Sequence, residues 1–280
     1  MTIKIVTDSS ADLPVQIFQE LGITVVPLYV RFGENVYRDR VDITESEFYQ
    51  RLQHDPIHPN TTQPTPQDFA EVYQKVSDKA GGIVSIHISG KLSGTCNSAL
   101  QGKELAAVKC PIEVIDSKSL TMALGLTVIA AAKLANQGKT LEQVVAEVKQ
   151  AIPTTHLLGL LDTLKYVSLG GRIGKAKALL GSILNVKPLL TLQDGETAPA
   201  GQVRSRSKGI DRLFDFVKGF TNIQDLAVVY NTTPDEAQAL VERIGAVFDK
   251  KLIHPATVGP VLGVHMGPGA LIVAIRVSQS

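Results

Sequence analysis

Residues 82–99, GIVSIHISGKLSGTCNSA, constrain the fold more than any other part of the chain. They begin with an apolar strand, and a short run of small hydroxyl residues and glycine then opens a helix. A strand that leads directly into a helix is the building unit of a parallel sheet covered by helices. Free N–H groups in the first helical turn favour an anion at this junction, although the same residues also suit an ordinary helix N-cap.

Strands and helices alternate along the first half of the chain. We expect strands at residues 3–7, 23–30, 83–88 and 112–115, and helices at 44–52, 65–79, 120–136 and 141–151. Pro27 inside the second strand indicates a sheet edge or a bulge. Residues 54–66 contain too many prolines for a helix or a central strand, and they therefore predict a long, stiff surface loop. The alternation favours a mostly parallel, covered sheet.

The pattern changes after Pro153, where we place a domain boundary. Beyond it we expect helices at 162–169, 175–184, 207–219 and 234–250, and strands at 156–161, 188–193, 197–203, 226–230 and 270–277. The second and third of these strands predict a hairpin. The predicted fold is α/β with two domains: residues 1–153 form a mostly parallel sheet, residues 154–280 form a smaller mixed-sheet unit, and a ligand lies between them.

The composition excludes several functional classes. Lysine and arginine (28 residues) nearly balance aspartate and glutamate (27), so the net charge gives no reason to expect nucleic acid as a partner. The two cysteines form no CxxC motif and no cluster with metal-ligand spacing, which predicts neither a metal site nor a disulfide scaffold. No leader-like or membrane-spanning segment and no nucleotide-binding motif occurs, so we expect a cytoplasmic protein without an integral membrane segment or a cofactor.

A local excess of positive charge lies in residues 162–218, where ten basic residues outnumber five acidic ones. This excess suits an anionic partner, and a solvated surface is the alternative explanation. Within it, Arg172 is flanked by glycines, which allow the backbone to approach a ligand closely while the guanidinium contacts it. Arg172 is therefore a candidate binding residue.

Two loops carry small hydroxyl side chains that could contact a ligand. Thr61 and Thr62 precede Gln63 on a backbone that is stiffened by flanking prolines. Ser93 and Gly94 lie at the start of the helix that we expect after the strand at residues 83–88. Hydroxyl and backbone N–H groups are hydrogen-bond donors, so both loops are candidates for binding an anion.

His265 lies beside a glycine-rich turn, HMGPG, near the carboxyl terminus. Histidine can pair with a carboxylate or transfer a proton near neutral pH, whereas a lone histidine can equally be structural. Ser93, His265 and Asp8 also supply the residue types of a nucleophilic triad, which leaves a serine hydrolase acting on acyl esters as an alternative. No G-x-S-x-G elbow surrounds any serine of the chain.

Five sequence blocks resemble those of one protein family and occur in the same order. They are TDSSADL at residues 7–13, TTQP at 61–64, LSGT at 92–95, SLGGRI at 168–173 and HMGPGA at 265–270. Together they extend over nearly the whole chain and are similar to the motifs of the DegV family of bacterial fatty-acid-binding proteins. The resemblance is specific because the ordered set recurs, whereas each motif alone is short.

This resemblance implies a two-domain α/β protein that holds one long-chain fatty acid. The tail is then buried in the protein and the carboxylate lies near the domain cleft. By the same resemblance, Thr61 and Ser93 bind the carboxylate, while His265 and Arg172 correspond to the family's histidine and arginine. Some members present the fatty acid to a separate ATP-dependent kinase that forms an acyl phosphate, so a fatty-acid kinase is the expected partner.

The sequence departs from the family pattern at several positions. Thr62 replaces the usual serine of the TSQP motif, Cys96-Asn97 replaces a tyrosine-containing pair, and Met266 stands where threonine is common. No proposed head-group ligand is lost, so we expect a non-enzymatic lipid carrier with an altered pocket shape. A serine hydrolase that uses Ser93 and His265 remains the alternative, and a protein-interaction module that uses the basic face is a third.

Overall fold

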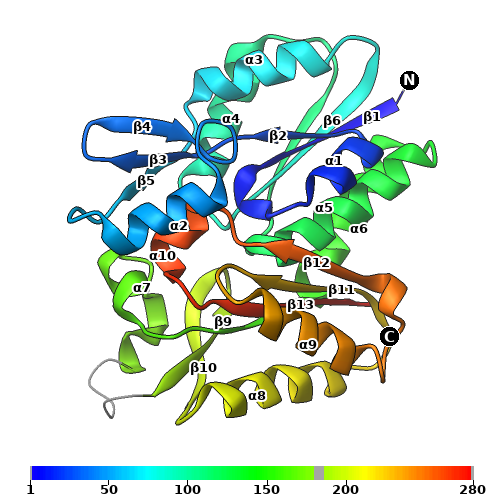
Figure 1. Ribbon diagram of the computed structural model, residues 1–280. Coiled ribbons are helices and arrows are strands. Elements are labelled where there is room, and N and C mark those ends of the chain that lie inside the picture. Colours follow the sequence, from blue (N-terminus) through cyan, green and yellow to red (C-terminus); the bar gives the residue numbers. More distant parts are fainter. Residues whose placement is uncertain (1, 180–185, 279–280) are drawn as a thin grey trace.

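The computed structural model describes residues 2–179 and 186–278 (Figure 1). Its first half is organised around a four-stranded sheet in which all neighbouring strands are parallel. The strands, in spatial order, are β2 (Ile23–Val26), β1 (Thr2–Asp8), β6 (Ala80–His87) and β7 (Ile112–Asp116). This sheet confirms the predicted parallel organisation.

Helices cover both faces of the parallel sheet. The alternation along β1 shows this, because Ile5 packs in one core and its neighbour Val6 in another. The core around Val6 also contains side chains of α3 (Pro66–Val76) and α4 (Thr95–Ala106). The core around Ile5 contains those of α5 (Thr121–Asn136) and α6 (Leu141–Thr154), with α1 (Val15–Leu21) packed against it.

The second half contains a six-stranded mixed sheet. Its strands, in spatial order, are β10 (Glu196–Val203), β9 (Lys187–Gln193), β8 (Thr155–Leu160), β13 (Leu271–Val277), β11 (Ile223–Tyr230) and β12 (Ile253–Thr257). All neighbours are antiparallel except β11 and β12, and β9 with β10 forms the predicted hairpin. Helices α8 (Arg206–Lys218) and α9 (Pro234–Ile244) pack on one face. The α/β class with a parallel and a mixed sheet is thus confirmed.

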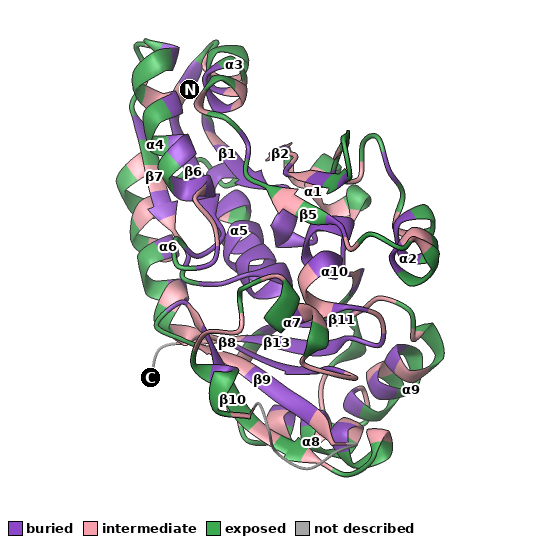
Figure 2. Cartoon of the chain, turned by 90° about the vertical axis from the view of Figure 1, so that its left-hand side faces the viewer, coloured by how far each residue is buried: buried purple, intermediate pink, exposed green. Residues whose placement is uncertain are grey.

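Helix α5 lies between these two sheets. Thirteen of its sixteen residues are buried, which explains why it is rich in apolar residues and lacks a polar face (Figure 2). Its core includes Ile5 and Ile86 of the parallel sheet, and also Ala227 and Ile272 of the mixed sheet. The two sheets therefore share one hydrophobic core through α5. The division at residue 153 remains a prediction.

A third, three-stranded antiparallel sheet corrects two predictions. It consists of β4 (Asn35–Arg38), β3 (Tyr29–Phe32) and β5 (Asn60–Thr62), and α2 (Glu45–His54) packs against it. The predicted strand at 23–30 is wrong, because the chain breaks at Pro27 and β2 and β3 belong to different sheets. The predicted loop at 54–66 is wrong at residues 60–62, since Thr61 pairs with Val30 of β3.

Other predicted elements differ in extent or were missed. The helix predicted at 175–184 is a 3-10 helix at Gly174–Leu179, and the remainder of that prediction falls in residues 180–185, outside the described residues. The helix predicted at 234–250 ends at Ile244. Two unpredicted elements, β12 and α10 (Pro260–Met266), precede the closing strand. Helix α10 bears directly on the site described next.

Candidate ligand-binding site

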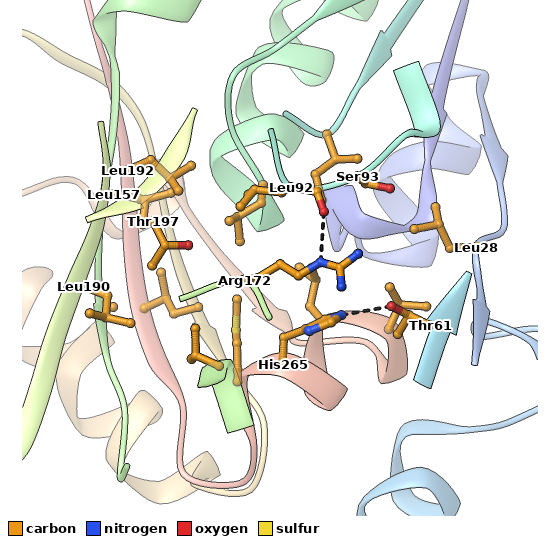
Figure 3. Close-up of a pocket in the computed structure, with 18 of the residues that line it drawn as sticks. Leu28, Thr61, Leu92, Ser93, Leu157, Arg172, Leu190, Leu192, Thr197 and His265 are labelled. Carbon is orange, nitrogen blue, oxygen red and sulfur yellow. Dashed lines mark hydrogen bonds between the residues drawn. The ribbon is translucent and has the colours of Figure 1, made fainter. Parts of the chain in front are cut away.

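A largely apolar cavity lies between the mixed sheet, α10, β5 and the loops that follow β6 and β7 of the parallel sheet (Figure 3). It encloses about 1020 Å³ of empty space, counting the open solvent at its mouth. Much of its wall is aliphatic and comes from β8, β9, β13 and α10, including Leu157, Leu190, Leu192, Val261, Leu262 and Ile272. Its aliphatic lining with a few polar side chains is that of a small-molecule site.

The sequence-predicted polar residues line one side of this cavity. Thr61, Thr62, Ser93, Arg172 and His265 all belong to its wall, although they come from β5, α10 and two different loops. Figure 3 shows Thr61, Ser93, Arg172 and His265 grouped on one side, with the aliphatic Leu157, Leu190 and Leu192 opposite. The cavity is therefore amphipathic, with a hydrogen-bonding end and a largely aliphatic end in which Thr197 lies among the leucines.

Thr61 and His265 are joined directly. The Thr61 Oγ1 atom lies 2.9 Å from the Nε2 atom of His265, across 204 positions of sequence. Burial lowers the pKa of His265 to about 4, and the positive charge of Arg172 and the neighbouring His58 add to this effect. The imidazole is therefore neutral at pH 7, and it can accept from or donate to the threonine hydroxyl according to its tautomer.

Gly170 provides the space that His265 occupies. A Cβ atom built on Gly170 would lie 2.0 Å from Nδ1 of His265, so no larger residue fits without displacing the ring. Within the described residues, this Nδ1 atom is buried and has no hydrogen-bond partner. An orphaned ring nitrogen is costly in a folded protein, which singles out this histidine as more than a packing residue.

Ser93 and Gly94 form the turn between β6 and α4. The Ser93 Oγ atom lies 2.8 Å from the Thr95 hydroxyl, and the Thr95 N–H donates to it over 3.3 Å. A Cβ atom on Gly94 would lie 2.5 Å from the side-chain amide of Gln63, so glycine allows the TTQP and LSGT segments to pack together. The turn thus places a hydroxyl beside the first turn of α4, where backbone N–H groups favour negative charge.

Arg172 connects the basic segment to this turn. Its Nε atom donates to the Leu92 carbonyl at 3.2 Å and its Nη1 atom to the Gly170 carbonyl at 2.7 Å. Both acceptors are uncharged, so neither contact neutralises the guanidinium. Arg172 brings a positive charge to the same end of the cavity as Thr61 and Ser93.

The geometry does not support a Ser93–His265–Asp8 triad. Asp8 is buried and its Oδ2 atom lies 2.9 Å from Nδ1 of a different histidine, His87. His265 instead contacts Thr61, and the hydroxyl of Ser93 contacts Thr95. The serine therefore lacks the hydrogen-bonded base that a hydrolase nucleophile needs.

Three contributors to the site were not among the predicted site residues. Gln63 and the first glycine of the GGR motif, Gly170, shape its polar end, whereas α10 supplies part of its wall. A signal for α10 was present, because Pro260 lies in its first turn and Gly267 follows it with a φ of +70°. The helix is only seven residues long and is interrupted by Gly263, so no apolar periodicity identified it.

The basic segment is partly neutralised by its own contacts. Arg206 binds Glu236 through two guanidinium nitrogens and Lys187 lies 2.9 Å from Asp162, so these side chains do not add fully to a positive surface. Residues 2–179 and 186–278 contain no cluster of metal-ligating side chains. Their helices are also too short or too polar to cross a membrane.

Comparison with known proteins gives the family. A family model described as "uncharacterised protein, DegV family" matches residues 2–277. The chain belongs to the DegV family. It is 39% identical over 279 residues to a DegV domain-containing protein of Streptomyces coelicolor, with 98% of each chain covered. A relative from Deinococcus radiodurans is 35% identical over 280 residues, with 99% of each chain covered.

Solved structures share the whole fold. A DegV family protein from Thermus thermophilus, described for fatty acid binding, superimposes with a TM-score of 0.89 at 34% identity, covering 99% of this chain and 100% of that one. DegV from Bacillus subtilis, a fatty acid binding protein, gives 0.90 at 28% identity and the same coverage. A stearic acid-binding protein from Eubacterium ventriosum gives 0.89 at 29% identity, with 98% of each chain covered. These similarities confirm the resemblance of the five sequence blocks.

Proposed function

We propose that this protein binds a single long-chain fatty acid, with the tail in the aliphatic part of the cavity and the carboxylate at its polar end. One observation carries the proposal: a single cavity joins aliphatic walls to the Thr61–His265 pair, Ser93 and Arg172. The fatty acids bound by family members of similar fold support it. At the head-group end, Thr62 also lines the cavity, and Gly94 allows the turn after Ser93 to pack against Gln63.

Burial of the tail supplies the affinity in this proposal. A chain of about 14 methylenes at about 0.8 kcal/mol each offers on the order of 11 kcal/mol, against an association cost of about 4 kcal/mol or more. The head group supplies orientation. A buried carboxylate without hydrogen bonds would cost several kcal/mol, and the hydroxyls of Thr61 and Ser93 with the N–H groups of α4 can offset that cost.

We further propose that the protein acts as a carrier for a separate ATP-dependent fatty-acid kinase. In that step a carboxylate oxygen attacks the γ-phosphorus of ATP, and ADP leaves as the acyl phosphate forms. Arg172, whose charge is not neutralised by its carbonyl acceptors, is placed to stabilise the added phosphoryl charge, and His265 to orient the carboxylate through Thr61. Because this proposed partner uses ATP, we also propose a cytoplasmic location for the complex.

Mass spectrometry of an organic extract from the purified native protein tests the binding proposal. We expect one fatty acid per protein chain, and titration of the delipidated protein with a fluorescent fatty acid should restore the same stoichiometry. Failure to extract or to bind any fatty acid would contradict the proposal. Turnover of an activated acyl ester, with labelling of Ser93 by a fluorophosphonate, would instead favour the hydrolase alternative.

A further inference from the structure

Two buried carboxylates hold the start of α10, the helix that carries His265. The Gly259 N–H donates to Oδ1 of Asp12 at 2.9 Å, and the Val261 N–H donates to Oδ1 of Asp39 at 3.4 Å. The two aspartates are 1% and 2% exposed, respectively. Both lie more than 200 residues away in sequence from the helix that they contact.

The same carboxylates are connected to other parts of the cavity wall. Asp12 accepts a hydrogen bond of 2.7 Å from Thr121 at the start of α5. The Asp39 N–H donates to the carbonyl of Leu28, and Leu28 lines the cavity beside Thr61. The pair therefore lies behind the head-group end of the site without contacting its interior. Neither aspartate belongs to the proposed ligand contacts.

Charge around the pair is unbalanced unless a proton is bound. Arg40 lies 3.2 Å from Asp12 and 3.5 Å from Glu45, the first residue of α2. One guanidinium thus contacts two carboxyl groups, while Asp39 forms no ion pair among the described residues. Tyr49, also on α2, donates to the Val258 carbonyl, and burial raises its pKa, so it stays neutral.

Asp8 is a further acidic side chain near the pair and supplies no positive charge. Asp8, at the end of β1, is engaged by His87 and by the Ile88 N–H rather than by the pair. Burial raises the pKa of Asp12 to about 6 and that of Asp39 to about 7, although Arg40 opposes both changes. Near neutral pH the cluster therefore gains or loses a proton.

We propose that Asp12 and Asp39 are positioning residues that keep α10 docked while the pair is protonated, and that loss of the proton loosens α10 and speeds fatty-acid exchange. This inference rests on the proposed function, because it concerns release from that site. Its physical basis is that Asp39, buried near the ionised Asp12 and without an ion-pair partner of its own in the described part of the chain, is unfavourable in its charged form. Opening the start of α10 admits water to them.

The direction of the pH effect follows from linkage. A carboxyl whose pKa is raised in the docked state binds more protons there than in an opened, hydrated state. Docking is then favoured at low pH and is weakened as pH rises towards the raised pKa of Asp39, about 7. With an ordinary pKa of about 4 in the opened state, exchange should become about tenfold faster between pH 6 and pH 8 and level off above that range.

The test is a stopped-flow measurement of fatty-acid dissociation between pH 5.5 and pH 8.5. The probe is cis-parinaric acid, a fluorescent conjugated C18 fatty acid, transferred from the protein to excess phosphatidylcholine vesicles. We expect the tenfold rise in the unsubstituted protein, and a slow, nearly pH-independent rate in Asp39→Asn, whose side chain cannot ionise. Asp78→Asn, the same change at an exposed aspartate outside the cluster, should keep the full rise.

A second measurement does not depend on lipid. Hydrogen-exchange protection factors for the amides of residues 259–266 should fall over the same pH range, and should stay level in Asp39→Asn. Arg40→Gln provides a further variant. Removing this cation should raise the pH midpoint of the dissociation-rate profile by about one unit, because the ionised carboxylates lose a stabilising positive charge. This variant is the test of the proposal if Asp39→Asn fails to fold.

The outcomes separate the two proposals. Bound fatty acid with a flat dissociation profile and level protection factors would overturn the inference and leave the proposed function intact. An unchanged pH profile in Asp39→Asn would also overturn it. Absence of fatty-acid binding would contradict the proposed function, and the protection factors of α10 would then decide whether the protonation-dependent docking exists.

Discussion

The two ends of the cavity differ in the structural elements that form them. The aliphatic end is made largely of strand residues from one continuous sheet, such as Leu157 on β8, Leu190 on β9 and Ile272 on β13. The polar end is assembled from β5, α10 and two loops that meet only in the folded protein. We infer that the aliphatic end provides affinity, which many similar side chains can share, and that the polar end provides position, which depends on single contacts.

The largest expected effect is at the aliphatic end. Gly159 lines the cavity, and a Cβ atom there would lie 3.4 Å from Ile272, so a larger side chain can enter the space without a backbone clash. Gly159→Leu should exclude about four methylenes and weaken C18 binding by about 3 kcal/mol, roughly 200-fold. A C12 fatty acid should bind almost as before. Equal weakening of both chain lengths would break the assignment of this end to the tail.

A substitution at the polar end can test the position of the His265 ring without changing any polar group. Gly170→Ala should displace the His265 ring, because its Cβ atom would lie 2.0 Å from Nδ1. We expect a loss of about 2 kcal/mol in the free energy of unfolding and weaker binding of all chain lengths, measured by denaturation and titration. Gly219→Ala, where the nearest atom is 3.3 Å away and φ is −73°, is the control. An unchanged free energy of unfolding in Gly170→Ala would show that the position of the His265 ring does not depend on a glycine at residue 170.

Removing a single head-group hydroxyl should cost less. Ser93→Ala should lower fatty-acid affinity by about 1.5 kcal/mol, roughly tenfold, because one hydrogen bond to the carboxylate is lost. The loss should be the same for C12 and C18, in contrast to Gly159→Leu. Ser77→Ala, at the C-terminal end of α3 and outside the cavity wall, should have no effect on affinity. A length-dependent loss in Ser93→Ala would place Ser93 against the tail instead.

The smallest expected effect is on acid stability. Burial lowers the pKa of His265 to about 4, so the unfolded chain binds more protons than the folded one between that pKa and the ordinary pKa of histidine. His265 should therefore destabilise the protein by about 1 kcal/mol as pH falls from 7 to 5, allowing for partial exposure. His265→Asn should reduce this loss in urea denaturation at the two pH values. His54→Asn, at an exposed histidine, should leave it unchanged.

Much of the fold followed from local sequence patterns. The parallel sheet was predictable because three of its four strands, β1, β6 and β7, are each followed by a helix, as at Ser93-Gly94. The break at Pro27 was visible, but the transfer of the chain to a third sheet was not, since it depends on pairing between β3 and β5. Short elements such as α10 depend on tertiary contacts that no local pattern records.

The site was predictable only as separate motifs. Thr61 and His265 belong to recognisable blocks, yet their contact spans 204 positions and required the fold. Gly170 was part of a noted motif, but its role depends on the ring that fills its missing side chain. Asp12 and Asp39 gave no functional signal, because an aspartate in a loop is ordinary until burial and its distant partners are known.

The position of α5 between the two sheets has a consequence for unfolding. A helix that is apolar on all sides has no stable place in water once either sheet leaves it. Partial unfolding that exposes one sheet would therefore also remove the support of the other, so the protein should lose its structure in one cooperative transition. A carrier that unfolds in this all-or-none way avoids half-open forms in which a bound lipid and its own interior would meet solvent together.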